Sequence, residues 1–145
     1  MKVKKPLGIK KCKSTELKEI AKMYEREMAK NFRKAGEKPI TKNKYNKILR
    51  KNIKKSEMWI LGDENSIQGF LWYVKDGKEY DVEEIFVLEK NRGYGKLLMK
   101  FLLGQAKKDK IKKLNADTHF NNNRAIKFVK KFGFSPRTIE FSKEL

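Results

Sequence analysis

The chain has 145 residues, of which 37 are Lys or Arg and 18 are Asp or Glu, giving a net charge of +19. This length predicts one domain over residues 1–145. No apolar run approaches the roughly 18 residues of a membrane span, and the first eleven residues, MKVKKPLGIKK, lack the apolar core of a signal peptide. The single cysteine excludes an internal disulfide, and one Cys with one His cannot form a metal-ligand cluster. We therefore expect a cytoplasmic protein without a metal site.

The positive charge invites a nucleic-acid hypothesis. Only six of the 37 basic residues are Arg, and the lysines are spread along the chain. Proteins that read bases and phosphates usually depend on the Arg guanidinium fork. We therefore favour a solvated surface that attracts anionic ligands, with a basic module associated with RNA or the ribosome as the alternative.

The first half of the chain predicts a strand, two helices and two strands. The first strand covers residues 8–13, and Ser14 is expected to cap a helix whose apolar stripe ends near residues 31–36. Thr41 caps a second helix after the break at Lys38-Pro39. Strands follow over residues 58–61 and 67–74, and Asp76-Gly77 predicts a hairpin.

The second half predicts a strand over residues 79–88, which completes an antiparallel meander, and then alternates helices with strands. A helix begins after Gly93 and is followed by a strand over residues 112–118. Asn122 caps the next helix, Gly133 ends it with a positive φ, and residues 138–142 form a terminal strand. The order predicts an α/β fold with a mixed sheet.

The most informative stretch lies between residues 80 and 108. An apolar run, Ile85-Phe86-Val87-Leu88, predicts a buried strand, and Gly93-Tyr94-Gly95 then opens a helix. A glycine turn that leads into a helix leaves several backbone N–H groups pointing at one place, at the positive end of the helix dipole. The sequence therefore predicts an anion site there, suited to a phosphate.

Two motifs carry a resemblance to a known family. KNRGYGKLLM resembles motif A of the GNAT superfamily of N-acetyltransferases, Gln/Arg-x-x-Gly-x-Gly/Ala, with Lys90 at its first position. NNNRAIKFVKKFGF resembles motif B, in which Asn122, Ala125, Gly133 and Phe134 match and Val129 stands where tyrosine is usual. The motifs lie in the expected order over about the last 65 residues.

The resemblance implies a GNAT-like fold, with a mixed, mostly antiparallel sheet flanked by helices and a splay between the fourth and fifth strands. It implies acetyl-CoA as cosubstrate and transfer of the acetyl group to a primary amine by direct, base-assisted attack. The pantetheine arm would bond the backbone of Ile85, Phe86 and Val87, and the Val87 N–H is the expected oxyanion donor. The pyrophosphate and the arm would further contact Arg92, Gly93, Tyr94, Gly95, Lys96 and Asn122.

Glu83 and Asp117 are the predicted catalytic bases. Strand alternation would place Asp81, Glu83, Ile85 and Val87 on one face, beside the expected cleft. Asp117 precedes Asn122 by five residues, where some family members carry a catalytic glutamate. Either carboxylate could instead solvate a strand end or cap a helix, and family members often use water as the base.

The acceptor is not named by the sequence. The basic segment 13–55 mildly favours an amine on an acidic molecule or at a protein N-terminus. Because valine at position 129 cannot donate a proton to the leaving thiolate, Tyr94 or water would have to do so. An acetyl-CoA-sensing module with little turnover is therefore a further alternative, and a homodimer is possible.

Overall fold

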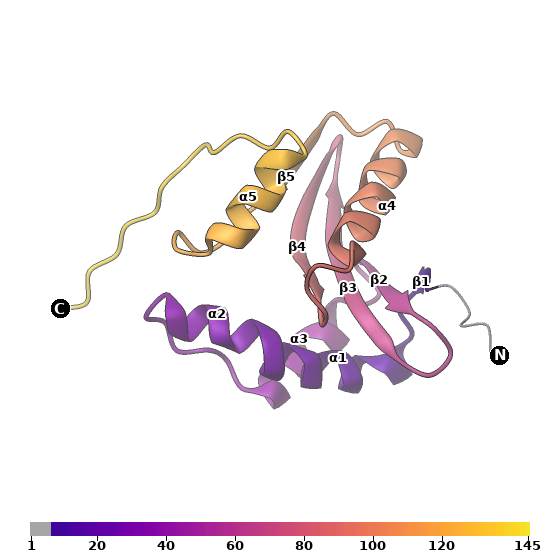
Figure 1. Ribbon diagram of the computed structural model, residues 1–145, viewed down its shortest axis with the longest axis horizontal. Coiled ribbons are helices and arrows are strands. Elements are labelled where there is room, and N and C mark those ends of the chain that lie inside the picture. Colours follow the sequence, from indigo (N-terminus) through magenta and orange to yellow (C-terminus); the bar gives the residue numbers. More distant parts are fainter. Residues whose placement is uncertain (1–6) are drawn as a thin grey trace.

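The structure, a computed structural model, describes residues 7–145 and contains one five-stranded sheet with helices on both faces (Figure 1). The expected absence of a signal peptide concerns residues 1–11, of which 1–6 lie outside the described residues. Within residues 7–145, no helix has both the length and the apolar character needed to cross a bilayer. The elements are β1 (Gly8–Lys11), η1 (Ser14–Glu16), α1 (Leu17–Met23), η2 (Tyr24–Met28), α2 (Ala29–Lys34), α3 (Lys42–Asn52), β2 (Glu57–Gly62), β3 (Ile67–Asp76), β4 (Glu79–Val87), α4 (Tyr94–Lys108), β5 (Lys113–Ala116) and α5 (Asn123–Lys131).

The sheet is mixed and mostly antiparallel, as predicted. Its strands follow the order β1-β2-β3-β4-β5; the first four pair antiparallel, and β5 pairs parallel with β4. β3 and β4 meet at a tight turn in which Gly77 has a φ of +60°, which confirms the hairpin expected at Asp76-Gly77. A parallel pair needs a crossover, and α4 provides it between β4 and β5.

Two apolar clusters lie on opposite faces of the sheet. Burial of each large apolar side chain in them stabilises the folded state by roughly 1.5–3 kcal/mol relative to leaving that side chain exposed. The first cluster joins the sheet to α1, η2 and α3, and includes Leu17, Ile20, Tyr24, Tyr45, Leu49, Phe70, Trp72 and Phe86. The second joins the sheet to α4, and includes Leu71, Tyr73, Tyr80, Val82, Leu98 and Leu102.

Three predicted helix ends are confirmed. The Lys44 N–H donates to Thr41 Oγ1 over 3.2 Å, and the Ala125 N–H donates to Asn122 Oδ1 over 3.2 Å. Both side chains therefore cap the helices that follow them. Gly133, with a φ of +89°, follows the end of α5 in the left-handed region that favours glycine.

Two other predictions are wrong, one about the start of the first helix and one about the C-terminal end of the chain. Ser14 does not cap the first helix, because the chain begins with the 3₁₀ turn η1, in which Glu16 Oε1 accepts from the Lys13 N–H over 2.9 Å. The strand predicted over residues 138–142 is absent. Residues 135–145 form no helix or strand, and each of them is exposed. A strand needs a neighbour for its backbone groups, and alternation of side chains alone does not supply one.

Candidate active site

The sheet opens between β4 and β5. Their pairing begins at Glu79 and Lys113 and ends at Val82 and Ala116, whereas β4 continues to Val87. Beyond Val82, β4 is paired with β3 on one side and has no strand on the other within residues 7–145. Backbone N–H and C=O groups on that side are available to a ligand that can act as a strand. The predicted segment Ile85-Phe86-Val87 lies in this part of β4, which is paired with β3 but has no neighbour on the side of β5 among the described residues.

The N-terminus of α4 follows directly after this segment. Gly93 adopts a φ of +76° in front of the helix, and its carbonyl accepts the first helical bond, from the Leu97 N–H over 3.0 Å. The N–H groups of Tyr94, Gly95 and Lys96 therefore have no acceptor within the helix. Among the described residues, no side chain caps this end, and a methyl group added at Gly93 would meet nothing within 4 Å. The arrangement leaves room for an anion at the helix dipole.

Cationic side chains surround the loop between β4 and α4. Arg92 Nε pairs with Glu89 over 3.1 Å, and Lys90 Nζ donates to the Val87 carbonyl over 3.1 Å. Removal from water lowers the pKa of Lys90, and the charges of Arg124 and Lys30 act in the same direction. Arg124 Nη2 donates to Asn91 Oδ1 over 3.0 Å, so α5 contributes a cation to this loop. Sequence reasoning missed Arg124, whose only signal was its place two residues after Asn122.

The predicted face of β4 is wrong because the strand contains a bulge. Trp72 pairs with Glu84, but the next residue of β3, Tyr73, pairs with Val82, so Glu83 is the extra residue. Tyr80 and Val82 consequently share the α4 cluster with Ile85 and Val87. Asp81 therefore points to the other face, the side of Glu84.

Glu84 follows the bulge directly and keeps the face that it shares with Phe86. It is partly buried on the face of the sheet that α1, η2 and α3 cover, opposite Trp72. Burial raises the pKa of Glu84 to about 8, and the charges of Asp117 and Glu83 act in the same direction. A carboxylate with a pKa near the working pH is suited to accept a proton.

Two tyrosines of the helical layer lie near Glu84. Tyr24 begins the π-helical turn η2, and its ring stacks on Tyr45 of α3 with centroids 3.9 Å apart. Burial raises the pKa of each phenol, and the charge of Glu84 adds to both increases. The Tyr45 hydroxyl is buried without a hydrogen-bond partner among the described residues. π-helical turns occur often at functional sites, where they change which side chains face inward.

The two predicted bases lie beside Glu84 but are exposed. Asp117 directly follows Ala116, whose partner is Val82, and so comes next to the bulge at Glu83. Burial, followed by the charges of Asp117 and Asp81, raises the pKa of Glu83. This end of the opening therefore holds the carboxyl groups of Asp81, Glu83, Glu84 and Asp117.

The loop after β5 reaches across to α2 and bounds the opening on that side. The His119 and Phe32 rings meet edge to face with centroids 4.7 Å apart, and Asn121 Nδ2 donates to the Lys34 carbonyl over 2.9 Å. Asn122, next in the chain, is held by its cap on α5. The loop is therefore fixed at both ends.

Comparison with known proteins identifies relatives of this fold. The model of the acetyltransferase (GNAT) family matches residues 17–134. No curated protein matches. The structure of YycN, a candidate acetyltransferase from Bacillus subtilis, is 21% identical, with 96% of this chain and 98% of that chain covered and a TM-score of 0.77.

Two further structures were solved with a ligand. A predicted acetyltransferase from Clostridium acetobutylicum, with acetyl-CoA, is 12% identical, with 95% of this chain and 96% of that chain covered and a TM-score of 0.70. The PaiA N-acetyltransferase from Thermoplasma acidophilum, in complex with coenzyme A, is 13% identical, with 94% of each chain covered and a TM-score of 0.75. At these identities the likeness shows a shared fold.

Proposed function

Because the chain belongs to the GNAT family of acetyltransferases, we propose that it transfers an acetyl group from acetyl-CoA to a primary amine, with Glu84 as the base. The observation that carries this proposal is the placement of Glu84. Its carboxyl is partly buried and has a pKa raised to about 8. It lies on β4, and the free backbone of β4 and the N-terminus of α4 together form the opening. Relatives of the same fold solved with acetyl-CoA or coenzyme A support the choice of cosubstrate.

The cosubstrate would occupy the opening in two parts. Its pyrophosphate would accept from the N–H groups of Gly93, Tyr94, Gly95 and Lys96, with Arg92 adding charge. Its pantetheine amides would bond the backbone of Ile85, Phe86 and Val87, in place of the missing strand. Asn122 lies in the loop that bounds the opening and would contact the arm.

The acceptor amine is protonated at neutral pH and must lose a proton before it attacks. In this proposal the carboxylate of Glu84 accepts the proton. The charges of Asp117 and Glu83 raise the pKa of Glu84 and therefore its affinity for a proton. A C–N bond then forms as the C–S bond breaks, and the Val87 N–H would stabilise the oxyanion. The thiolate leaves and takes a proton from Tyr94 or water, because Val129 has none to give.

The charges at the opening favour a cationic acceptor. Asp81, Glu83 and Asp117 come together beside Glu84 at the bulge, although the chain as a whole carries +19. An ammonium group would be attracted to this place, and a carboxylate or phosphate next to the amine would be repelled. We therefore propose a cationic acceptor in place of the acidic one that the basic segment 13–55 favours.

The test measures binding and turnover separately. Isothermal titration with acetyl-CoA should give micromolar or tighter binding, and free thiol should appear with a diamine faster than with an amine on an acidic peptide. Gly95→Asp places negative charge at the anion site and should abolish binding. Gly104→Asp, the same change at an exposed position late in α4, is the matched control.

The possible outcomes separate the alternatives. If the wild-type protein bound no acetyl-CoA, the proposal would fail. Binding without thiol release for any amine would support the sensing module instead. Equal loss of affinity in the Gly95→Asp and Gly104→Asp variants would show that the N-terminus of α4 does not hold the pyrophosphate.

A further inference from the structure

Lys90 lies in the loop between β4 and α4, and its ammonium reaches back to the strand, where Nζ donates to the Val87 carbonyl over 3.1 Å. The ladder between β3 and β4 fixes the direction of that carbonyl. The Leu88 N–H donates to the Gln68 carbonyl over 2.9 Å, so these two residues form a hydrogen-bonded pair. In an antiparallel ladder such pairs alternate with pairs whose N–H and C=O groups point away from each other. Val87, opposite Gly69, therefore directs both of its groups away from β3 and into the opening.

The Lys90 ammonium consequently occupies a place that the cosubstrate needs. In the proposed function a pantetheine amide bonds the backbone of Val87, and the Val87 N–H stabilises the oxyanion. The N–H and C=O groups of one strand residue point to the same side of the strand. An ammonium bonded to this carbonyl therefore lies next to the expected position of the thioester.

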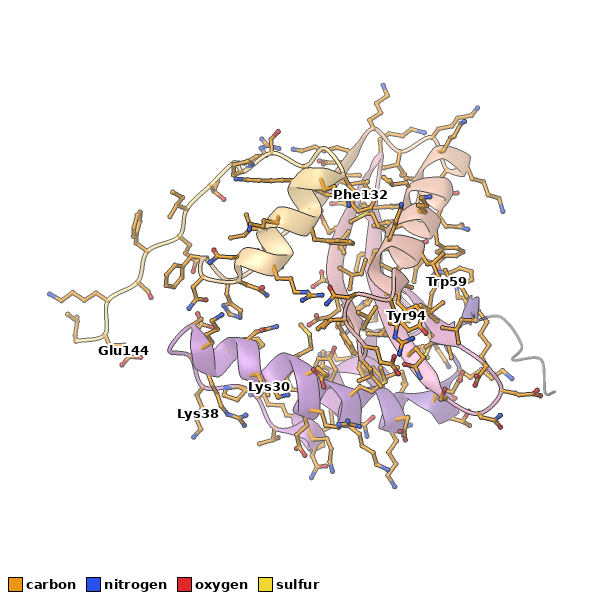
Figure 2. All side chains as sticks on the ribbon, in the orientation of Figure 1. Lys30, Lys38, Trp59, Tyr94, Phe132 and Glu144 are labelled. Carbon is orange, nitrogen blue, oxygen red and sulfur yellow. The ribbon has the colours of Figure 1, made fainter. Side chains whose placement is uncertain are left out.

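Lys90 also lies on the side of the sheet from which an acceptor would come. The charges of Glu27 in η2 and Lys30 in α2 act on its ammonium, so the group lies towards the helical layer (Lys30 is labelled in Figure 2). Glu84, the proposed base, lies on the same face of the sheet. The amine of Lys90 can therefore approach the thioester from the direction of the acceptor.

The surroundings of Lys90 increase the fraction of its amine that is neutral and able to attack. Removal from water lowers the pKa of Lys90, the charges of Arg124 and Lys30 lower it further, and the charge of Glu27 acts in the opposite direction. The hydrogen-bond partner of Nζ is a neutral carbonyl, whereas a carboxylate would hold the proton by its charge. Lys30, by contrast, pairs with Glu27 over 4.0 Å.

We propose that the protein transfers the acetyl group of bound acetyl-CoA to the Nζ of its own Lys90 when no acceptor is present. The step rests on the proposed binding of acetyl-CoA. Lys90 first loses one proton to water, to which its side chain is exposed. The Nζ lone pair then attacks the thioester carbon, the C–N bond forms as the C–S bond breaks, and a second proton passes from Nζ to the leaving thiolate. The products are acetyl-lysine at position 90 and coenzyme A.

Acetylation of Lys90 changes the site. It replaces a positive charge in the phosphate loop by a larger, neutral amide beside the Val87 carbonyl. The modified chain attracts the phosphates of acetyl-CoA less strongly, and its opening is narrower. The protein should therefore lose activity gradually when it is kept with acetyl-CoA in the absence of an acceptor.

The first experiment incubates the full chain with acetyl-CoA alone and follows its mass. The chain should gain one acetyl group, located on Lys90 by fragmentation, with a rate constant that does not depend on protein concentration. Lys90→Arg keeps the charge, removes the amine and should lose this product. Lys30→Arg makes the same change at the neighbouring lysine and should retain it. Equal uptake by the wild type and the Lys90→Arg variant, or uptake spread over many exposed lysines, would overturn the proposal.

The second experiment separates this step from the proposed function. Titration with acetyl-CoA and thiol release with a diamine are measured on the same preparation. A chain that binds acetyl-CoA and acetylates the diamine but leaves Lys90 unmodified would overturn acetylation of Lys90 alone. A chain that binds no acetyl-CoA would overturn both. The Gly95→Asp variant should lose the Lys90 product together with binding, and full modification of Lys90 in that variant would show that bound acetyl-CoA is not the donor.

Discussion

At the scale of single residues, Glu84 leads to a prediction about rate and pH. A base must be deprotonated to act, so kcat/KM should rise with pH up to about 8 and level off above it. Glu84→Gln should lower kcat/KM by about 10²- to 10⁴-fold and remove this inflection. Steady-state rates at a series of pH values check both points. An unchanged profile in the variant would leave water as the proton acceptor.

The neighbours of Glu84 serve as controls in the same measurement. Asp117→Asn and Glu83→Gln each remove a negative charge that raises the pKa of Glu84. If these residues act through Glu84, the inflection moves to lower pH while much of the activity remains. If either is itself the base, its variant instead loses activity to the extent expected for Glu84→Gln.

Glu84 also leads to a prediction about stability. Its pKa is about 8 in the folded chain and close to the ordinary 4.5 in the unfolded chain. Between these values the folded state holds a proton that the unfolded state lacks, so stability falls as pH rises through this window. Glu84→Gln should remove this loss, and its melting temperature should exceed that of the wild type increasingly from about pH 5 to about pH 9. A difference in melting temperature between variant and wild type that stays constant from about pH 5 to about pH 9 would contradict the raised pKa.

The choice between Glu83 and Glu84 shows what the sequence could not provide. The run Asp81 to Val87 predicts a strand, and strict alternation would then place Glu83 on the face of Ile85. The bulge opposite Trp72 and Tyr73 changes this assignment for every residue before it. A bulge depends on how two strands fit together, so no local pattern in β4 reveals it.

At the scale of elements, the glycine in front of α4 and a glycine inside it have opposite conformations. Gly93 has a φ of +76°, whereas Gly104 lies in the helix interior, and a methyl group would meet nothing within 4 Å at either position. Gly104→Ala should stabilise the fold by about 0.5–1 kcal/mol, and Gly93→Ala should destabilise it by about 1–2 kcal/mol. Urea denaturation of both variants measures the difference. Equal effects would show that Gly93 is not held in the left-handed region.

Elements that depend on nearby residues were predictable, and those that depend on distant ones were not. Thr41, Asn122 and Gly77 carry their caps and turn within a few residues, and the structure has all three. The strand predicted at residues 138–142 has an adequate pattern but no partner strand among residues 7–145. The π-helical turn at Tyr24–Met28 likewise depends on packing against α3.

At the scale of the whole molecule, charge is distributed unevenly. The average of +19 predicts attraction for anions everywhere, but β4 and the end of β5 bring Asp81, Glu83 and Asp117 to one place beside Glu84. The loop before α4 gathers Lys90, Arg92 and Arg124 at another. The opening therefore has a cationic end suited to phosphates and an anionic end suited to an amine. Only the fold reveals this separation, because residues far apart in the chain form each end.

This separation predicts how salt should affect the cosubstrate. The Debye length shrinks from about 10 Å at 0.1 M to about 3 Å at 1 M, so affinity for acetyl-CoA should fall several-fold across this range. Acetyl-pantetheine, which lacks the phosphates, should show little change. Arg124→Gln should reduce the salt dependence because Arg124 lies at the phosphate loop. Lys107→Gln removes the same charge about 20 Å away at the other end of α4 and should leave it unchanged. Titration calorimetry gives each affinity, and equal slopes for the two variants would mean that the net charge of the molecule, not the loop, attracts the phosphates.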